Sequence, residues 1–274
     1  MPTAALIVST YNQPDHLDRC LLALKKQTLR DFELILADDG SDERTRLVID
    51  KYSTAFANAV IHLWQEDRGF RKTQILNKAM LATSANYLVF MDGDCLAHPD
   101  FVSEHLAYAK RGHYLNGSMI RLNRQLTDRI GHEAIAAGDV FRSVWLTGQG
   151  RAWNRRYHRF SLGYKTRRWL DRYSRTKLYW LGANSSCFRE DALAVNGFDN
   201  RFTYGFEDGD FGNRLENFGL VPATVRWTAN VLHLFHGRPW DQPGVQEKNL
   251  TMVTPKEPGG PFWAQDGADR FSGS

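Results

Sequence analysis

The sequence is poor in cysteine and has no apolar run long enough to cross a bilayer. Its three cysteines, Cys20, Cys95 and Cys187, lie far apart and include no C-x-x-C pair, which excludes a disulfide framework and a zinc knuckle. No apolar stretch approaches the roughly 20 residues of a membrane-spanning helix. Residues 1–9 also lack the basic start and apolar core of a signal peptide. These absences predict a soluble or peripheral protein of a reducing, cytoplasmic compartment.

A strong charge bias is lacking as well. The 274 residues include 35 Lys and Arg against 31 Asp and Glu, which gives a formal net charge of +4. This mildly basic balance allows anionic partners without requiring them. The 16 Phe, 10 Tyr and 8 Trp need a core or a binding surface, which excludes full disorder. The length is enough for one sizeable α/β domain or two small ones.

Apolar strand patterns alternate with helical patterns in the first 110 residues. The strands are predicted at residues 4–9, 32–37, 60–63 and 87–91, and the helices from residue 15, over 43–52 and around 73–83. This alternation predicts an α/β fold with a right-handed, doubly wound, mostly parallel sheet. Ligands bind beyond the carboxyl ends of such strands. The polar clusters at 9–12, 38–41 and 92–94 follow strand ends, so we expect one cleft to hold all three.

A basic, aromatic-rich segment covers residues 121–178. Arginine and lysine far outnumber its four acidic residues, and tryptophans such as Trp145, Trp153 and Trp169 are interleaved with them. We interpret the segment as a mainly helical insertion. A solvated basic face is one alternative, and RNA binding is another that no nucleic-acid motif supports. The pattern favours an anionic membrane surface or a lipid-linked acceptor.

Two acidic turns follow predicted strands. Asp92 and Asp94 flank a glycine, and such a pair can reach a divalent cation and the diphosphate that it bridges. The alternative is an acidic turn that caps the next helix. Residues 38–41 include Asp39, which can accept a hydrogen bond from a base N–H or a ribose hydroxyl. Taken alone, this second turn favours a helix N-cap.

Two further clusters lie downstream. Glu207, Asp208 and Asp210 surround a glycine, and a carboxylate is the obvious base for an acceptor hydroxyl. A calcium loop or a helix start near residue 211 are alternatives, although the spacing does not match an EF-hand. His233 and His236 are three residues apart, so a helix or a turn can aim both at one metal. Such a pair is more often structural unless distant carboxylates join it.

Taken together, these motifs resemble a known family. Residues 9–12, 38–41, 68–72 with 76–77, and 92–94 occur in the order found in family 2 glycosyltransferases of the GT-A fold. Residues 196–199, 204–208 and 233–236 resemble the C-terminal motif of β1,4-galactosyltransferases and bacterial chondroitin-type polymerases. The resemblance covers about residues 4–110 and 179–237.

The resemblance implies a single GT-A domain over residues 1–253. Residues 1–110 form its nucleotide-sugar-binding half, 121–178 the basic insertion and 179–253 the acceptor- and metal-binding half, and a tail follows at 254–274. The residues implied to bind the UDP-sugar are Ser9, Thr10, Tyr11, Asp39, Arg71, Asp92, Gly182 and Asn184. The implied ligands of a Mn²⁺ or Mg²⁺ ion are Asp94, His236 and His233. Asp208 is the implied catalytic base, with Glu207 beside it.

The implied activity is inverting transfer of a hexose or N-acetylhexosamine from a UDP-sugar to a glycan or lipid-linked acceptor. The expected setting is bacterial surface polysaccharide synthesis at the inner face of the plasma membrane, without nucleic acid. Galactose or N-acetylgalactosamine is preferred from the resemblance alone, and Tyr204 and Phe206 depart from the family's usual tryptophans. A sugar nucleotidyltransferase is an alternative, but residues 9–13 lack its glycine-rich loop. A non-catalytic binding module is another, against which the retention of Asp94, Asp208 and His236 together argues.

Overall fold

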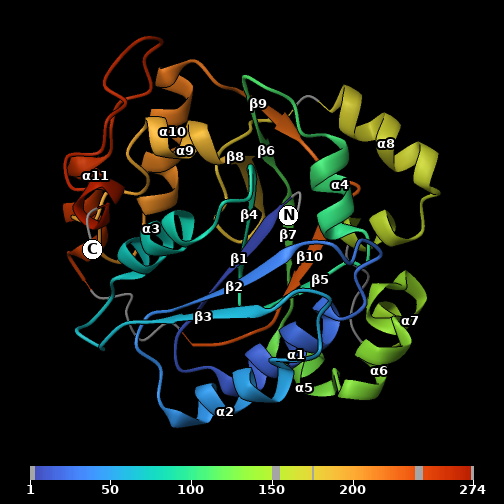
Figure 1. Ribbon diagram of the computed structural model, residues 1–274. Coiled ribbons are helices and arrows are strands. Elements are labelled where there is room, and N and C mark those ends of the chain that lie inside the picture. Colours follow the sequence, from blue (N-terminus) through green and yellow to red (C-terminus); the bar gives the residue numbers. More distant parts are fainter. Residues whose placement is uncertain (1–3, 150–154, 175, 238–242, 273–274) are drawn as a thin grey trace.

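Two β-sheets form the centre of the molecule, and helices pack around them (Figure 1). The computed structural model describes residues 4–149, 155–174, 176–237 and 243–272. The larger sheet has seven strands in spatial order β3 (Val60–Trp64), β2 (Glu33–Asp38), β1 (Ala5–Thr10), β4 (Tyr87–Asp92), β8 (Ser185–Phe188), β6 (His113–Asn116) and β9 (Val221–Thr224). The smaller sheet has the order β5 (Cys95–Ala97), β10 (Asn230–His233) and β7 (Ser118–Arg121).

The larger sheet is mostly parallel. Strands β3, β2, β1 and β4 all run the same way, β8 runs antiparallel to both β4 and β6, and β9 is parallel to β6. The four N-terminal strands lie within one residue of the positions that their apolar runs predict. The α/β architecture expected from the sequence is therefore confirmed.

Alternate side chains of β1 point to opposite faces of the sheet, so each face has its own apolar core. Leu6 and Val8 pack with α1 (Pro14–Leu24), α2 (Glu43–Tyr52) and α4 (Phe101–Ala107). Ala5 and Ile7 pack with α3 (Lys72–Ala82), α9 (Arg189–Ala194) and α10 (Glu207–Phe218). This two-sided burial explains why the strand reads as a continuous apolar run.

The basic insertion is mainly helical, as predicted. Its elements are α5 (Arg124–Arg129), α6 (His132–Ala137), the 3₁₀ helix η1 (Asp139–Phe141), α7 (Ser143–Gly148), the 3₁₀ helix η2 (Arg155–Phe160) and α8 (Tyr164–Tyr173). Leu126, Ile135 and Leu146 form a third apolar cluster with Leu232 and Leu234. The insertion therefore shares a core with β10. Of its predicted basic and aromatic residues, Arg151, Trp153 and Arg175 lie outside the described residues.

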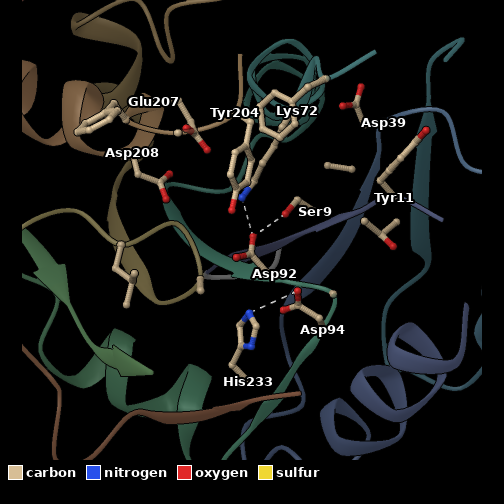
Figure 2. A pocket seen from close by; sticks show the side chains of 18 of the residues that line it. Ser9, Tyr11, Asp39, Lys72, Asp92, Asp94, Tyr204, Glu207, Asp208 and His233 are labelled. Atoms are coloured by element: carbon tan, nitrogen blue, oxygen red, sulfur yellow. Dashed lines mark hydrogen bonds and ion pairs between the residues drawn. The ribbon is translucent and has the colours of Figure 1, made fainter. Parts of the chain in front are cut away.

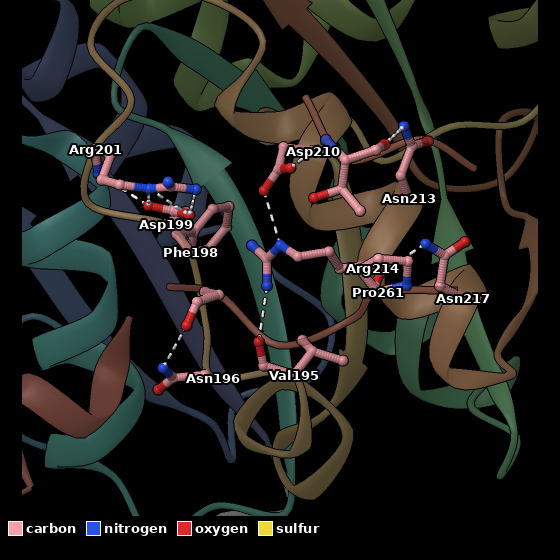
Figure 3. Close-up of polar contacts among 12 residues, drawn as sticks. Val195, Asn196, Phe198, Asp199, Arg201, Asp210, Asn213, Arg214, Asn217 and Pro261 are labelled. Atoms are coloured by element: carbon pink, nitrogen blue, oxygen red, sulfur yellow. Dashed lines mark hydrogen bonds and ion pairs between the residues drawn. The ribbon is translucent and has the colours of Figure 1, made fainter. Parts of the chain in front are cut away.

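The C-terminal segment is attached to the domain. It contains α11 (Val245–Met252) and the 3₁₀ helix η3 (Ala268–Phe271). Residues 254–272, whose prolines and glycines predict a tail, pack against α10 and, through η3, against α3. The side-chain amide of Asn217 donates to the carbonyls of Pro255 and Pro261 at 2.9 and 2.7 Å, and Figure 3 shows Asn217 beside Pro261. Ala264 is buried as well. Composition does not reveal such amide-to-backbone hydrogen bonds. In the described part of the chain, no helix has the length and apolar character needed to cross a membrane.

Candidate active site

One cavity of about 780 Å³ opens where the carboxyl ends of β1 and β4 meet the start of α10. Ten of the predicted site residues line it, namely Ser9, Thr10, Tyr11, Asp39, Asp92, Asp94, Glu207, Asp208, His233 and His236. In Figure 2, Glu207 and Asp208 lie on one side of the cavity and Tyr11 and Asp39 on the other, with Asp92 and Asp94 between them. The three strand-end clusters thus share one cleft, as the parallel topology predicts.

Asp94, His233 and His236 form a cluster suited to a metal ion. One ligand atom from each lies within 4.8 Å of the other two, and Oδ2 of Asp94 is 2.9 Å from Nε2 of His236 and 3.6 Å from Nε2 of His233. A carboxylate with two imidazoles suits Mn²⁺ and similar divalent ions. Three side chains leave coordination positions for a ligand such as a diphosphate.

The smaller sheet brings these three residues together. Strand β10 pairs antiparallel with β5, which places His233 opposite Cys95. The backbone N–H of Leu234 then donates to the carbonyl of Asp94 at 2.9 Å. This long-range pairing holds residues 94 and 233–236 at one point, which no local spacing in the sequence specifies.

The charges at this cluster keep Asp94 ionised. Burial alone raises the pKa of Asp94, but the hydrogen bond from His236 and the charges of the two histidines lower it to about 2. The Nδ1 of His236 lies 2.6 Å from the carbonyl oxygen of Gly237. This contact fixes the orientation of the ring, with Nε2 directed at Asp94, and a bound cation would take the place of the Nε2 proton. The cluster is thus prepared for a cation.

Asp92 is held by two donors at the cavity floor. Its Oδ1 accepts from the Ser9 hydroxyl at 2.8 Å and from the Lys72 ammonium at 2.7 Å (Figure 2). Burial lowers the pKa of Lys72, but the negative charges of Asp92, Asp208 and Glu207 outweigh it and raise that pKa. Lys72 is a cavity residue that the sequence analysis missed, because a lysine at a helix start is usually solvated. Its place in the 68–72 motif was the available signal.

Asp39 lies at the far end of the cavity from Asp208. Its Oδ1 accepts from the side-chain amide of Gln65 at 2.6 Å, and its Oδ2 accepts from the backbone N–H of Arg71 at 2.8 Å. Burial raises the pKa of Asp39. The predicted Arg71 does not line the cavity, because its guanidinium turns toward the carbonyl of Glu66. At this end of the site, Arg71 therefore contributes its backbone N–H, which holds Asp39, and not its side chain.

Asp208 lies in the first turn of α10. The helix begins at Glu207, earlier than the expected start near residue 211, because Gly205 and Phe206 turn the chain with positive φ angles of 98° and 69°. Oδ2 of Asp208 accepts from the backbone N–H of Gly182 at 3.0 Å. Within the described residues, its buried Oδ1 has no hydrogen-bond partner. One carboxylate oxygen is therefore anchored while the other is free to accept a proton.

Burial raises the pKa of both carboxyl groups at this end of the cavity. For Glu207 the pKa rises to about 7, first because of burial and then because of the charge of Asp208. The pKa of Asp208 is also raised by burial, against the opposing charge of Lys72. Raised pKa values suit groups that must take up a proton near neutral pH.

Gly182 does not line the cavity, but its lack of a side chain is necessary for Asp208. A Cβ atom at this position lies 2.5 Å from Oδ1 and 2.6 Å from Oδ2 of Asp208. We expect Gly182→Ala to displace the carboxylate and lower kcat by about tenfold or more. Thermal unfolding and kcat measured together check this result. The matched control is Gly131→Ala, whose Cβ meets no atom within 4 Å; equal kcat in both variants contradicts the prediction.

Asn184 is the third predicted residue that does not line the cavity. It is fully buried, and its amide donates to the carbonyls of Ser118 and Ala229 at 2.9 and 2.8 Å. Its Oδ1 lies 2.9 Å from Nε2 of His105. Asn184 therefore joins the two sheets as a core side chain and does not line the cavity.

Two known families match this chain. The family described as glycosyl transferase family 2 matches residues 5–185, and the family described as N-terminal domain of galactosyltransferase matches residues 167–237. The two matches overlap over residues 167–185, around the end of the insertion. They correspond to the two halves of the cavity, with the strand-end clusters in the first and the 204–208 and 233–236 motifs in the second.

Relatives with known names match a stretch of somewhat over a third of this chain. Validoxylamine A glucosyltransferase of Streptomyces hygroscopicus subsp. jinggangensis is 37% identical over 109 residues, which are 39% of this chain and 25% of that protein. Chondroitin synthase of Escherichia coli is 27% identical over 103 residues, which are 37% of this chain and 15% of that protein. The matched part thus spans a quarter or less of the length of these two relatives.

Solved structures share the fold over most of the chain. S. aureus TarS 1–349 in complex with UDP-GlcNAc has a TM-score of 0.64 at 15% identity, covering 92% of this chain and 64% of that one. Mannosyltransferase PcManGT from Pyrobaculum calidifontis, in complex with GDP-Man and Mn²⁺, has a TM-score of 0.55 at 17% identity, covering 87% and 59%. The fold is that of the GT-A glycosyltransferases. Since its match covers well over half of the sequence, the chain belongs to glycosyl transferase family 2, and the resemblance inferred from the motifs is confirmed.

Proposed function

We propose that the chain is an inverting, metal-dependent transferase that moves a hexose or N-acetylhexosamine from a UDP-sugar to a hydroxyl of a glycan or lipid-linked acceptor. The observation that carries this proposal is the sharing of one cavity by the Asp94–His233–His236 cluster and the half-free, buried carboxylate of Asp208. The nucleotide-sugar complexes of the neighbouring folds, one of them with Mn²⁺, support the same chemistry.

The donor is expected to lie along the cavity from Asp39 to Asp208. Asp39, fixed by Gln65 and the backbone of Arg71, accepts the uracil N–H. Asp92, fixed by Ser9 and Lys72, accepts a hydroxyl of the ribose or the sugar. Asp94, His233 and His236 hold the cation, which when bound neutralises the charge that develops on the departing diphosphate. The Lys72 ammonium adds positive charge at the cavity floor.

Asp208 acts as the general base at the sugar end. Its Oδ1 takes the proton from the acceptor hydroxyl as the hydroxyl oxygen attacks the anomeric carbon from the face opposite the diphosphate. The new glycosidic bond forms while the bond from the sugar to the phosphate oxygen breaks, and UDP leaves with that electron pair. A single displacement inverts the anomeric carbon. Glu207 lies beside the base and holds a second acceptor hydroxyl.

A donor panel tests the activity directly. UDP-galactose, UDP-N-acetylgalactosamine, UDP-glucose and UDP-N-acetylglucosamine are each incubated with Mn²⁺, with Mg²⁺ or with a chelator, and UDP release is measured. GDP-mannose serves as the nucleotide control. Metal-dependent release from a UDP-sugar, with galactose or N-acetylgalactosamine preferred, is the expected result. Release of pyrophosphate from a nucleoside triphosphate and a sugar phosphate identifies a nucleotidyltransferase instead, and the absence of any turnover favours a binding module.

The metal cluster makes a separate prediction. We expect His236→Ala to weaken Mn²⁺ binding by more than about 100-fold, since a change in a ligand's surroundings alone costs 10–100-fold. Isothermal titration of Mn²⁺ in the presence of UDP measures the effect. His132→Ala is the control, because that histidine lies outside the cavity. Unchanged Mn²⁺ affinity in the His236 variant removes this residue from the metal site.

The setting of the reaction remains a proposal. We expect the acceptor to belong to a surface polysaccharide of bacterial type, built at the inner face of the plasma membrane. Contact of residues 121–178 with an anionic membrane stays a prediction from the sequence. Co-sedimentation with anionic vesicles at low and moderate salt tests it, and sedimentation unaffected by removal of the basic side chains speaks against it.

A further inference from the structure

A second cavity, of about 800 Å³, lies outside the catalytic cavity, between helix α8 and the edge strand β9. Helix α8 supplies Arg168, Trp169, Arg172 and Tyr173, the loop before β6 supplies Lys110, and β9 lines the cavity with Val221–Thr224. Figure 1 shows α8 at the rim of the molecule, beyond α4 and the end of β9. We call this cavity the α8 groove.

The α8 groove carries positive charge without internal compensation. Within the described residues, Lys110, Arg168 and Arg172 have no carboxylate at ion-pair distance. Of the described lining residues, Asp171 alone is acidic, and its oxygens already accept from the backbone N–H of Trp227 at 2.8 Å and the hydroxyl of Thr228 at 2.7 Å. The groove therefore offers an anionic ligand three cations that have no carboxylate partner among the described residues.

Two aromatic rings stand beside these cations. Trp169 is 59% exposed and Tyr173 58% exposed, and their ring centroids are 5.4 Å apart. Exposed rings of this size gain from stacking on another apolar face, while their polar edges stay wet. A pyranose ring has an apolar C–H face and a polar rim, so it fits such a ring next to hydrogen-bond donors.

The α8 groove and the catalytic cavity are neighbours. Leu178 lines the groove, and the next residue, Tyr179, lines the catalytic cavity. Consecutive Cα atoms are only about 3.8 Å apart. The segment around residues 178 and 179 therefore forms part of the wall of both cavities.

We propose that the α8 groove binds an anionic saccharide, a segment of the acceptor chain behind the sugar that receives the new unit. Lys110, Arg168 and Arg172 bind carboxylate or phosphate groups on the chain, and Trp169 and Tyr173 stack on its sugar rings. The groove is concave and bounded on one side by β9, which suits a chain and not a flat bilayer. Calling the ligand an acceptor segment rests on the proposed function, whereas binding in the groove needs neither donor nor metal.

The test measures binding to the full chain in the absence of donor and metal. The probe is an octasaccharide of alternating uronate and N-acetylhexosamine units, compared with the same octasaccharide after reduction of its carboxylates to alcohols. Arg168→Gln with Arg172→Gln is expected to weaken binding of the charged probe by about tenfold or more, through loss of charge-assisted hydrogen bonds. Trp169→Ala is expected to weaken both probes. Lys26→Gln with Lys248→Gln is the matched control, because it removes the same charge from exposed sites outside the groove.

Three outcomes overturn the proposal. These are equal affinity for the two probes, equal loss of affinity in the control variant, and a loss of binding to anionic phospholipid vesicles in the double variant while octasaccharide binding stays unchanged. The last result assigns α8 to a membrane. Asp208→Asn is expected to bind the probe as the original chain does. Turnover without octasaccharide binding rejects the proposed role of the α8 groove and leaves the proposed function intact. Octasaccharide binding without any turnover supports the role of the groove and rejects the proposed function.

Discussion

Replacing Asp208 by asparagine is expected to lower kcat by about 10²- to 10⁴-fold, the contribution of a positioned general base. Asparagine has nearly the same shape and can still accept the hydrogen bond that Gly182 donates to Asp208. It cannot, however, take a proton from an acceptor hydroxyl. The expected effect is therefore on the chemical step, with Mn²⁺ affinity unchanged because Asp94 and the two histidines are untouched. Steady-state kinetics and Mn²⁺ titration on the same preparation check both parts.

The pH profile separates a base from a merely structural carboxylate. Burial raises the pKa of Asp208, and the neighbouring Glu207 has a pKa of about 7. A base acts only when deprotonated, so activity should fall as the pH decreases through the apparent pKa of this pair. The acidic limb assigned to Asp208 should change in the asparagine variant. Asp15→Asn, in the first turn of α1, is the control, and normal turnover in the Asp208 variant removes that residue from the base role.

Local sequence patterns predict the strand-end side of the cavity well. The apolar runs before Ser9, Asp39 and Asp92 identify strands buried on both faces, and parallel strands bring their carboxyl ends to one edge. The metal cluster is different, because Asp94 meets His233 and His236 only through the pairing of β10 with β5. The order of the motifs suggested that these three residues meet. Their spacing in the sequence alone did not decide whether they do.

The acidic cluster at 207–210 shows why sequence spacing alone does not assign roles. Asp208 and Asp210 look equivalent in the sequence, but both lie in α10, where two residues correspond to a rotation of about 200°. Asp208 therefore faces the cavity, and Asp210 faces the core. Lys72 is a functional candidate that the sequence alone does not reveal. Its ammonium faces Asp92 only because α3 packs against β1.

The second large effect is expected on stability, at the pair that Asp210 forms with Arg214. Both side chains are buried, and Nε of Arg214 donates to Oδ2 of Asp210 at 2.7 Å. Arg214 also donates to the carbonyl of Val195 at 2.8 Å, and Oδ1 of Asp210 accepts from the backbone N–H of Thr254 at 2.9 Å (Figure 3). The pair thus joins α10, the end of α9 and the C-terminal segment.

Arg214→Met is expected to lower the free energy of unfolding by about 3–5 kcal/mol, because it leaves the Asp210 carboxylate buried without its partner charge. Urea unfolding followed by tryptophan fluorescence measures the loss. Arg270→Met breaks the exposed pair with Asp266, which has the same four-residue spacing, and about 0–1 kcal/mol is expected there. Asp210→Asn combined with Arg214→Met should recover part of the loss, since it removes the uncompensated charge. A single Arg214 variant no less stable than the Arg270 variant shows that the buried pair does not hold these three segments together.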